Sequence, residues 1–270
     1  MAVRIVFSDI DGTLLTDDKR VTERTAYAVR ALVKKGIRFV PVSARMPEAI
    51  APILREIGIV APIIAYSGAL VLTEAGEELA SVRMAEADTR AALGVLAPYG
   101  TAVTVNYYAG HRWLVPVLDA QVQHEMDITQ ARAEVADLEA ALAGGTLSHK
   151  LLVMCAPKDC ARLREELVAA LPALCVVRSA PHLIEIMEKT VSKARGIDVL
   201  LAHYGLTRGS AIAFGDNYND LEMLDAIPES VVMGNAPEAI RARARHVTAT
   251  NEADGIYAYL VRRGILEAQP

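Results

Sequence analysis

The stretch from Val3 to Leu15 reads Val-Arg-Ile-Val-Phe-Ser-Asp-Ile-Asp-Gly-Thr-Leu-Leu, and it decides the fold of the chain. Apart from Arg4, the segment before the serine is apolar and rich in β-branched and aromatic residues, which favours a short buried strand. This strand runs directly into Asp9 and Asp11. Because residues two apart in an extended chain point to the same side, both carboxylates are expected to face one crevice.

Two carboxylates held this close need a cation between them, or one of them must take up a proton. A hard cation with oxygen ligands, Mg²⁺ by default, is the simplest solution. Gly12 follows the pair and allows a positive φ and a close approach of the main chain to a ligand. A strand followed by an acidic, glycine-containing turn is also common without any ligand. This stretch alone therefore does not establish a metal site, and the other motifs of the chain are needed.

The composition describes a compact globular protein. The 270 residues fit one large or two modest domains, and the hydrophobic fraction is 53% with a mean hydropathy of +0.26. The 28 Lys and Arg against 33 Asp and Glu give a net charge of −5. This mild acidity and the lack of a basic run give no reason to expect a nucleic-acid partner.

Three cysteines, Cys155, Cys160 and Cys175, form no C-x-x-C pair and cannot all be bridged within one chain. Reduced, buried thiols in a cytosolic protein are therefore expected. The amino terminus reaches Asp9 too early to leave room for a signal peptide, and no apolar run approaches membrane-spanning length. The expected location is cytoplasmic, without a membrane partner.

The first third of the chain alternates between strands and helices. After the first strand, the pattern predicts a helix over 22–35, a strand over 37–42, a helix over 47–57 and a strand over 61–65. This order is typical of a parallel sheet with crossover helices. Polar residues follow the strand ends at Asp9, Ser43 and Ser67. In open α/β sheets, ligands bind at that edge.

From about Met84 the pattern changes to a mixture of helices and antiparallel strands. The segments expected are a helix over 85–96, a hairpin of 101–108 and 112–117, a helical region over 130–143, a strand over 150–155, a helix over 158–171, and strands over 174–177 and 183–187. Because this segment lacks acidic strand ends, it is interpreted as an inserted domain.

The remainder returns to the first pattern. It predicts a helix over 192–204 that carries Lys193, a strand over 210–214 that ends before Asp216, a helix over 221–226, a strand over 230–233, a helix over 236–243, an edge strand over 247–249 and a closing segment over 252–263. The fold class is α/β, a Rossmann-like parallel-sheet core with helices on both faces and an inserted α+β cap domain. The expected core is 1–83 with 188–270, and the expected cap is 84–187.

Four motifs resemble those of the haloacid dehalogenase superfamily of phosphohydrolases. Phe7 to Leu15 is similar to its first motif, and Gly215-Asp216-Asn217-Tyr218-Asn219-Asp220 is similar to its fourth, Gly-Asp-x-x-Asn-Asp. Ser43 and Lys193 match the second and third motifs in position. A cap between the second and third motifs is typical of the Cof-type branch, which has a subclass IIB cap.

This resemblance assigns a role to each catalytic candidate. It implies that Asp9 is the nucleophile, that Asp11 is the general acid and base, and that Lys193 screens Asp9 and binds phosphoryl oxygens. For its role Asp11 needs a carboxyl whose proton affinity is raised by its environment.

The resemblance also implies a Mg²⁺ site and a set of phosphate or substrate contacts. The metal candidates are Asp9, Asp11 through its main-chain carbonyl, Asp216 and, in a supporting position, Asp220. The phosphate and substrate candidates are Gly12, Thr13, Ser43, Ala44, Arg45, Ser67, Gly68 and Asn219. The chain departs from the branch at Ala44, where glycine is usual, and at Ser67, where asparagine is usual.

The function expected is Mg²⁺-dependent hydrolysis of small phosphorylated metabolites, either sugar phosphates or a phosphorylated cofactor, through an aspartyl-phosphate. A phosphosugar mutase of the phosphomannomutase type and a non-catalytic phosphoacceptor or binding module are the alternatives, and the chain is expected to be a monomer or homodimer.

The cap residues considered for substrate selection are Tyr107, His111, Arg112, Trp113, His149 and Lys150. For Trp113, packing within the cap is the favoured interpretation.

Overall fold

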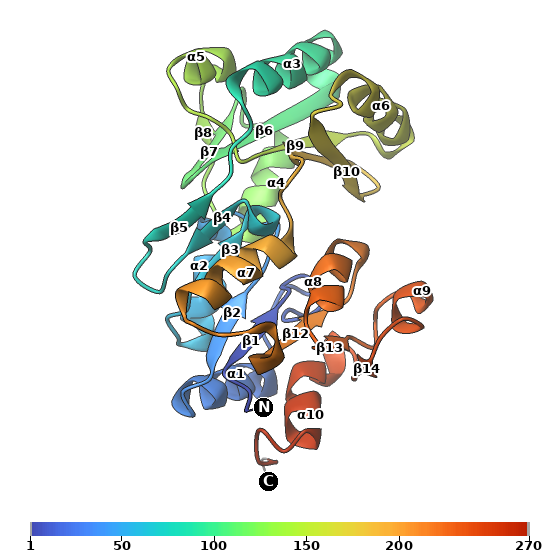
Figure 1. The fold of residues 1–270 in the computed structure, drawn as a ribbon. Coiled ribbons are helices and arrows are strands. Elements are labelled where there is room, and N and C mark those ends of the chain that lie inside the picture. The colour runs from blue at the N-terminus through green and yellow to red at the C-terminus, as the bar shows by residue number, and fades with distance from the viewer. Residues whose placement is uncertain (1, 269–270) are drawn as a thin grey trace. The chain divides into compact units, whose positions relative to one another are not determined.

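The computed structural model describes residues 2–268 and divides into two compact units (Figure 1). The first unit consists of Met1–Ala80 and Ser192–Pro270, and the second unit, Ser81–Val191, is inserted between those two segments. No helix within residues 2–268 has both the length and the apolar character needed to span a membrane.

The first unit is built on a five-stranded parallel sheet in the order β14-β13-β12-β1-β2. The strands are β1 (Ile5–Ser8), β2 (Arg38–Pro41), β12 (Ala211–Gly215), β13 (Glu229–Val232) and β14 (His246–Val247). Ser8 lies opposite both Pro41 and Phe214, so β1, β2 and β12 end level with one another. This register places the residues that follow these strands at one edge of the sheet.

Helices pack on both faces of this sheet, as the alternation of segments predicted. They are α1 (Glu23–Lys34), α2 (Pro47–Ile57), α7 (Lys193–His203), α8 (Leu221–Ala226), α9 (Glu238–Arg241) and α10 (Gly255–Arg262). On one face Ile5 and Phe7 pack in a core that includes Ile197 of α7. On the other face the ring of Phe214 meets Tyr259 of α10 edge-on at 5.6 Å between centroids. Burial on both faces explains the continuous apolar run of β1.

The predicted strand over 61–65 does not continue the parallel sheet. β3 (Ile63–Ala65) instead belongs to a three-stranded sheet with β4 (Leu70–Leu72) and β5 (Glu78–Ser81), and it pairs antiparallel with β4. Only a single parallel bridge, between Val42 and Ile64, joins it to the end of β2. The chain reverses between β3 and β4 through the 3₁₀ turn η1 (Tyr66–Gly68), which the strand pattern alone did not reveal.

The second unit contains a six-stranded sheet in the order β10-β11-β9-β6-β7-β8. Its strands are β6 (Val103–Ala109), β7 (Arg112–Val115), β8 (Glu134–Val135), β9 (Lys150–Cys155), β10 (Leu174–Ala180) and β11 (Leu183–Glu188), and its helices are α3 (Glu86–Leu96), α4 (Ala120–Thr129), α5 (Leu138–Ala143) and α6 (Pro157–Ala170). Its main core joins Leu93, Leu142 and Leu163, from α3, α5 and α6, to strand residues such as Leu151. The predicted hairpin is confirmed, but its turn is shorter than the predicted 109–111, because Ala109 still pairs with Arg112.

The prediction of one helical region over 130–143 is wrong. The helices are α4, which ends before Gln130, and α5, with the short strand β8 between them. Asp119 starts α4 because its carboxylate accepts from the N–H of Gln121 and Val122, and Asp137 caps α5 in the same way. Gln130 ends α4 in a left-handed conformation with φ 57°. Capping by single side chains therefore outweighed the helical composition of the segment.

Helix α7 lies very close to the turn η1. A Cβ placed on Gly196 would lie 2.7 Å from Ile64 Cγ2 and 3.1 Å from Gly68 Cα. We therefore expect Gly196→Ala to destabilise the first unit by about 1–3 kcal/mol through overpacking. Urea unfolding followed by circular dichroism measures this change.

The matched control is Gly94→Ala in α3, where a Cβ would meet nothing within 4 Å. That change should stabilise its helix by roughly 0.5–1 kcal/mol because alanine loses less backbone entropy on folding. Equal effects of the two substitutions would contradict the close packing of α7.

Candidate active site

Three carboxylates meet where β1 and β12 end. Oxygen atoms of Asp9, Asp216 and Asp220 all lie within 4.8 Å of one another, and the three residues are 5%, 8% and 0% exposed. Asp9 directly follows β1, and its N–H donates to the carbonyl of Phe214 at 2.9 Å. The other two carboxylates come from the turn after β12, so the parallel pairing of β1 with β12 brings the first and fourth motifs together.

Lys193, the first residue of α7, lies between two of these carboxylates. Its Nζ is 2.5 Å from Asp9 Oδ1 and 2.6 Å from Asp220 Oδ1, and the side chain is almost completely buried. Burial by itself would lower the pKa of Lys193, but Asp220 and Asp9 outweigh it and raise that pKa. The pKa of Asp9 is raised well above its usual range by burial and by Asp220, against the opposing effect of Lys193.

Asp216 is held by the loop that follows β1. The hydroxyl of Thr13 donates to Asp216 Oδ1 at 2.9 Å. Burial still raises the pKa of Asp216 to about 6, although this hydrogen bond opposes the shift. Gly12 has φ +82°, and a Cβ there would lie 2.5 Å from Asp216 Oδ2. Only glycine fits between the loop and this carboxylate, which explains the glycine of the first motif.

Asp220 holds the turn after β12 together. Its Oδ2 accepts from the N–H of Asp216 at 2.9 Å and of Asn217 at 3.0 Å, while its Oδ1 is bound by Lys193. Both oxygens therefore have partners, which agrees with a supporting position for Asp220. Asn219 lies in the 3₁₀ turn η4 (Tyr218–Asp220), and its side chain is exposed.

The carboxylates fit a hard divalent cation. Three carboxylates and one ammonium leave an excess of two negative charges in a buried site. Within residues 2–268 no hydrogen bond reaches Asp9 Oδ2 or Asp216 Oδ2, so Asp216 has an oxygen left to bind a cation and Asp9 has one left for a further partner. Oxygen donors and excess negative charge are what Mg²⁺ requires of a protein site.

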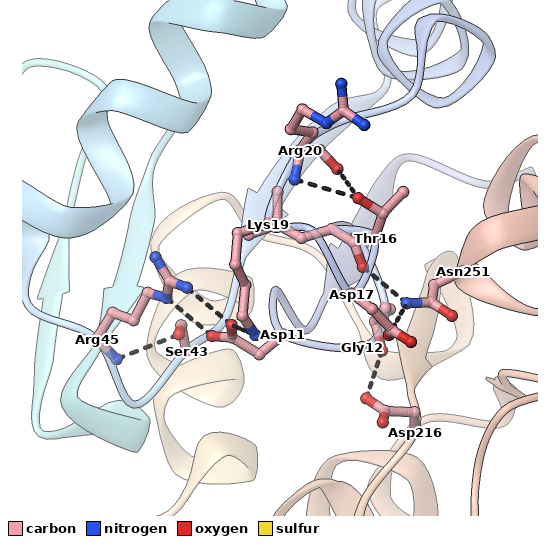
Figure 2. A network of polar contacts seen from close by, with 12 residues as sticks. Asp11, Gly12, Thr16, Asp17, Lys19, Arg20, Ser43, Arg45, Asp216 and Asn251 are labelled. Atoms are coloured by element: carbon pink, nitrogen blue, oxygen red, sulfur yellow. Dashed lines mark hydrogen bonds and ion pairs between the residues drawn. The ribbon is translucent and has the colours of Figure 1, made fainter. Parts of the chain in front are cut away.

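The carboxylate of Asp11 points toward Arg45, not toward Asp216, and is bound by two cations (Figure 2). Arg45 Nε donates to Asp11 Oδ2 at 2.8 Å and Arg45 Nη2 donates to Asp11 Oδ1 at 2.7 Å, while Lys19 Nζ donates to Oδ1 at 2.9 Å. Burial raises the pKa of Asp11, but Arg45 and Lys19 outweigh it and hold the pKa well below its usual range. The expected raised proton affinity is therefore wrong for this arrangement, because the sequence did not show that Arg45 forms a bidentate pair here.

Ser43 and Ser67 lie in two loops that are hydrogen-bonded to each other. The N–H of Ser67 donates to the Ser43 carbonyl at 2.8 Å, and the N–H of Arg45 donates to Ser43 Oγ at 3.2 Å. Ser43 is buried, and Ala44 between it and Arg45 is half-buried. Tyr66, Ser67 and Gly68 are consecutive left-handed residues with φ 49°, 56° and 103°. Ser67 thus occupies a conformation that asparagine, usual in the branch, tolerates better.

The candidates in the second unit have structural partners. Trp113 is buried, stacks on Tyr108 at 5.5 Å between centroids and donates its indole N–H to Asn106 Oδ1 at 3.0 Å, so its predicted packing within this unit is confirmed. Tyr107 donates to the Thr146 carbonyl. The remaining partners are Glu134 for the exposed Arg112 and Glu185 for the buried Lys150.

His149 is buried within the second unit and has a defined tautomer. The N–H of Gly110 donates to His149 Nδ1 at 2.9 Å, so Nδ1 carries no proton. Nε2 therefore holds the ring proton and donates it to Ser81 Oγ, also at 2.9 Å. Burial, with the charges of Arg83 and His111, lowers the pKa of His149 to about 4.

The residues that the sequence motifs did not indicate include Lys19, within the loop after β1, and Asn235 and Asn251, which contact that loop. The two asparagines follow β13 and β14, so the rule that polar residues after parallel strands face the ligand edge could have identified them. Lys19 carried no such signal, because it lies in a charged loop outside any regular element.

The sequence matches the family model of haloacid dehalogenase-like hydrolases over residues 6–260. A Haemophilus influenzae protein named "Putative phosphatase" is 34% identical over 257 residues, covering 95% of this chain and 96% of that protein. The 5-amino-6-(5-phospho-D-ribitylamino)uracil phosphatase YitU of Bacillus subtilis is 29% identical over 271 residues, covering 95% and 96%.

The chain therefore belongs to the haloacid dehalogenase-like hydrolase family, and it is a phosphoric monoester hydrolase. Its fold is shared with a haloacid dehalogenase-like hydrolase from Bacteroides thetaiotaomicron (TM-score 0.87, 24% identity, 97% of this chain and 99% of that one). It is also shared with the subclass IIB sugar phosphatase BT4131 (TM-score 0.85, 24% identity, 98% and 100%). The α/β fold class with an additional sheet domain is thereby confirmed.

Replacing Lys193 by methionine should destabilise the first unit strongly. The change leaves Asp9 and Asp220 buried without their ammonium partner, and we expect a loss of about 3–5 kcal/mol near neutral pH. Urea unfolding in the presence of a chelator measures it without interference from bound metal.

The control for Lys193→Met is Arg208→Met, which removes the ion pair between Arg208 and Asp198. Asp198 lies in α7, the helix that begins with Lys193. Both side chains of that pair are 46% exposed, so the expected loss is only about 0–1 kcal/mol. Losses of similar size in both variants would contradict the role of burial at Lys193.

His149 should make the second unit sensitive to acid. Because its pKa is about 4 when folded and about 6.5 when unfolded, the unfolded chain binds the proton more readily between these values. Stability is fully present above about pH 6.5 and falls by up to about 3 kcal/mol as the pH drops to about 4. Urea unfolding of the second unit across this range is the measurement.

In the variant His149→Gln, the free energy of unfolding should depend less on pH than in the wild type, because the titrating ring is gone. His124→Gln, at an exposed position of α4, is the control and should keep the wild-type slope. A wild-type slope in His149→Gln would show that His149 does not cause the acid sensitivity.

Proposed function

We propose that the chain is a Mg²⁺-dependent phosphatase of small phosphorylated metabolites that works through an aspartyl-phosphate on Asp9. The observation that carries the proposal is the state of the Asp9 carboxylate at the end of β1. Lys193 binds its Oδ1, whereas no hydrogen bond from residues 2–268 reaches its Oδ2. A fixed carboxylate with one unengaged oxygen is suited to attack phosphorus.

In the first step, Asp9 Oδ2 forms a bond to phosphorus while the bond from phosphorus to the ester oxygen breaks. The leaving oxygen keeps the electron pair of that bond and takes a proton from Asp11. In the second step, water attacks phosphorus and gives its proton to Asp11. The bond between Asp9 and phosphorus then breaks, which restores the carboxylate and yields inorganic phosphate.

The cations around Asp9 support the first step. Lys193 would reduce repulsion between the Asp9 carboxylate and the phosphate dianion and would bind a phosphoryl oxygen. Mg²⁺ held by Asp216 and by the Asp9 oxygen that does not attack phosphorus would supply further positive charge, which would lower the pKa of Asp9 and favour its ionised, nucleophilic form. Asp220 would keep Lys193 and the turn at 216–217 in place through the bonds described above.

Asp11 has to leave its ionised state before it can act as an acid. Arg45 and Lys19 are the cations that hold its pKa down. An incoming phosphate dianion competes for both cations, and if it draws them away, the pKa of Asp11 rises. On this proposal, substrate binding itself prepares the proton donor. Arg45 then serves both as a partner of Asp11 in the free enzyme and as a phosphate ligand in the complex.

The names of relatives support small phosphorylated metabolites as substrates. YitU acts on a phosphorylated ribitylaminouracil, and a Cronobacter sakazakii relative, 26% identical over 244 residues with 88% of this chain and 87% of that protein covered, is an HMP-PP phosphatase. The first of these names specifies a 5-phosphorylated ribityl chain on an aminouracil, and the structural neighbour BT4131 is a sugar phosphatase. Sugar phosphates and phosphorylated cofactor precursors are therefore the substrates to test first.

We expect Asp9→Asn to lower phosphate release at least 10³-fold while leaving the fold intact, because an amide cannot form the aspartyl-phosphate. Release is measured on a panel of phosphorylated metabolites with Mg²⁺ and with a chelator, and circular dichroism checks the fold. Asp198→Asn, at a half-buried position of α7 away from the cluster, is the matched control and should keep wild-type rates.

Wild-type rates in Asp9→Asn would show that Asp9 is not the nucleophile. Phosphate release that persists in chelator would show that hydrolysis does not need a metal. Conversion of glucose 1-phosphate into glucose 6-phosphate without net release would favour the mutase alternative. A stable phosphorylated protein without turnover would favour the phosphoacceptor alternative.

A further inference from the structure

The loop that follows Asp11 is held in place by two asparagines from the C-terminal part of the chain. Asn235 donates its side-chain N–H to the carbonyl of Gly12 at 2.8 Å. Asn251 donates to the carbonyl of Leu15 at 3.0 Å and to Asp17 Oδ1 at 3.2 Å (Figure 2). The loop over 12–17 is thus tied at both of its ends to residues more than 200 positions away.

The two asparagines are also joined to each other. The main-chain N–H of Asn251 donates to Asn235 Oδ1 at 3.0 Å, so the amide of Asn235 is used at both its oxygen and its nitrogen. Asn235 follows β13 and Asn251 follows β14, which places both at the same sheet edge as Asp9. Asn251 is 5% exposed, so its amide hydrogen bonds are largely protected from water.

The residue that most needs such support is Gly12. Glycine has the widest choice of φ and ψ, so its two flanking peptide groups are not fixed by its own sterics. One of these peptide groups contains the carbonyl of Asp11, and the other contains the carbonyl that Asn235 binds. Thr13, the next residue, donates its hydroxyl to Asp216. Fixing the Gly12 carbonyl therefore sets the orientation of the peptide group between Gly12 and Thr13, which leads directly to the Thr13 hydroxyl.

We propose that Asn235 and Asn251 are positioning residues that fix the main chain from Gly12 to Leu15. The consequence is a defined position for the Thr13 hydroxyl beside Asp216, and a narrower range of positions for the Asp11 carbonyl, which lies one peptide group before the fixed one. This inference rests on the proposed Mg²⁺ site, since the groups positioned are those expected to bind or support the cation. A hydrogen bond that serves only general stability would not affect cation binding separately from folding.

The test uses the full chain with three single variants: Asn235→Ala, Asn251→Ala and, as a matched control, Thr248→Val. Thr248 donates its hydroxyl to the carbonyl of Gly255 at 2.7 Å in the same C-terminal region, but this bond does not reach the loop over 12–17. Three quantities are measured for each protein. They are amide hydrogen exchange over 12–17, the rise in melting temperature on adding Mg²⁺, and the Mg²⁺ concentration for half-maximal phosphate release.

Both asparagine variants should exchange the amides of the loop at least fivefold faster than the wild type, and both should need at least fivefold more Mg²⁺ for half-maximal stabilisation and release. Thr248→Val should lower the melting temperature and leave the loop exchange and the Mg²⁺ requirement unchanged. The double variant Asn235→Ala with Asn251→Ala should be close to the worse single variant, because the two residues act through one network.

Unchanged loop exchange in Asn235→Ala would overturn the proposal, and so would a Mg²⁺ requirement that Thr248→Val raises to the same extent. The measurements also separate this proposal from the proposed function. If the wild-type protein neither binds Mg²⁺ nor releases phosphate, the proposed function fails, while hydrogen exchange still decides whether the asparagines fix the loop. If the wild type binds Mg²⁺ and the variants match it, only the positioning role fails.

Discussion

The buried excess of negative charge at the end of β1 and β12 is the constraint on which the rest of the site depends. Three carboxylates share a small volume with a single ammonium group, that of Lys193. Such an arrangement is costly unless the charges are paired or a cation is added, and the raised pKa of Asp9 expresses that cost. The first unit tolerates it because strand ends, a helix start and backbone N–H groups all converge on the carboxylates.

Each supporting group binds a different carboxylate of the site. The N–H groups of Asp216 and Asn217 satisfy one oxygen of Asp220, and Thr13 satisfies one oxygen of Asp216. The second acidic residue of the first motif, Asp11, is kept out of the cluster by Arg45 and Lys19. These two cations pair the charge of a fourth carboxylate, which even so contributes to the raised pKa of Asp216.

Much of the fold could be predicted from the sequence, because the signals for strands and helices in the first unit are local. The helix over 47–57 matches α2, and the helix predicted over 22–35 contains α1, which Thr22 caps. The predictions that failed concern segments whose local pattern is ambiguous. The region over 130–143 has helical composition but contains the cap of α5. The strand over 61–65 pairs antiparallel with β4, a strand that the sequence pattern did not predict.

By itself, the sequence determined at which edge of the sheet Asp9, Ser43 and Asp216 lie, because strand ends and motif spacing are properties of neighbouring residues. Only the tertiary structure decided how their charges are paired. Thr13 and Asp216 are 203 positions apart, and Gly12 and Asn235 are 223 apart. Contacts of this kind depend on strand order and on the exact distances between side chains, so Asp11 could be recognised from its motif, but its ion pair with Arg45 and Lys19, and hence its lowered pKa, could not.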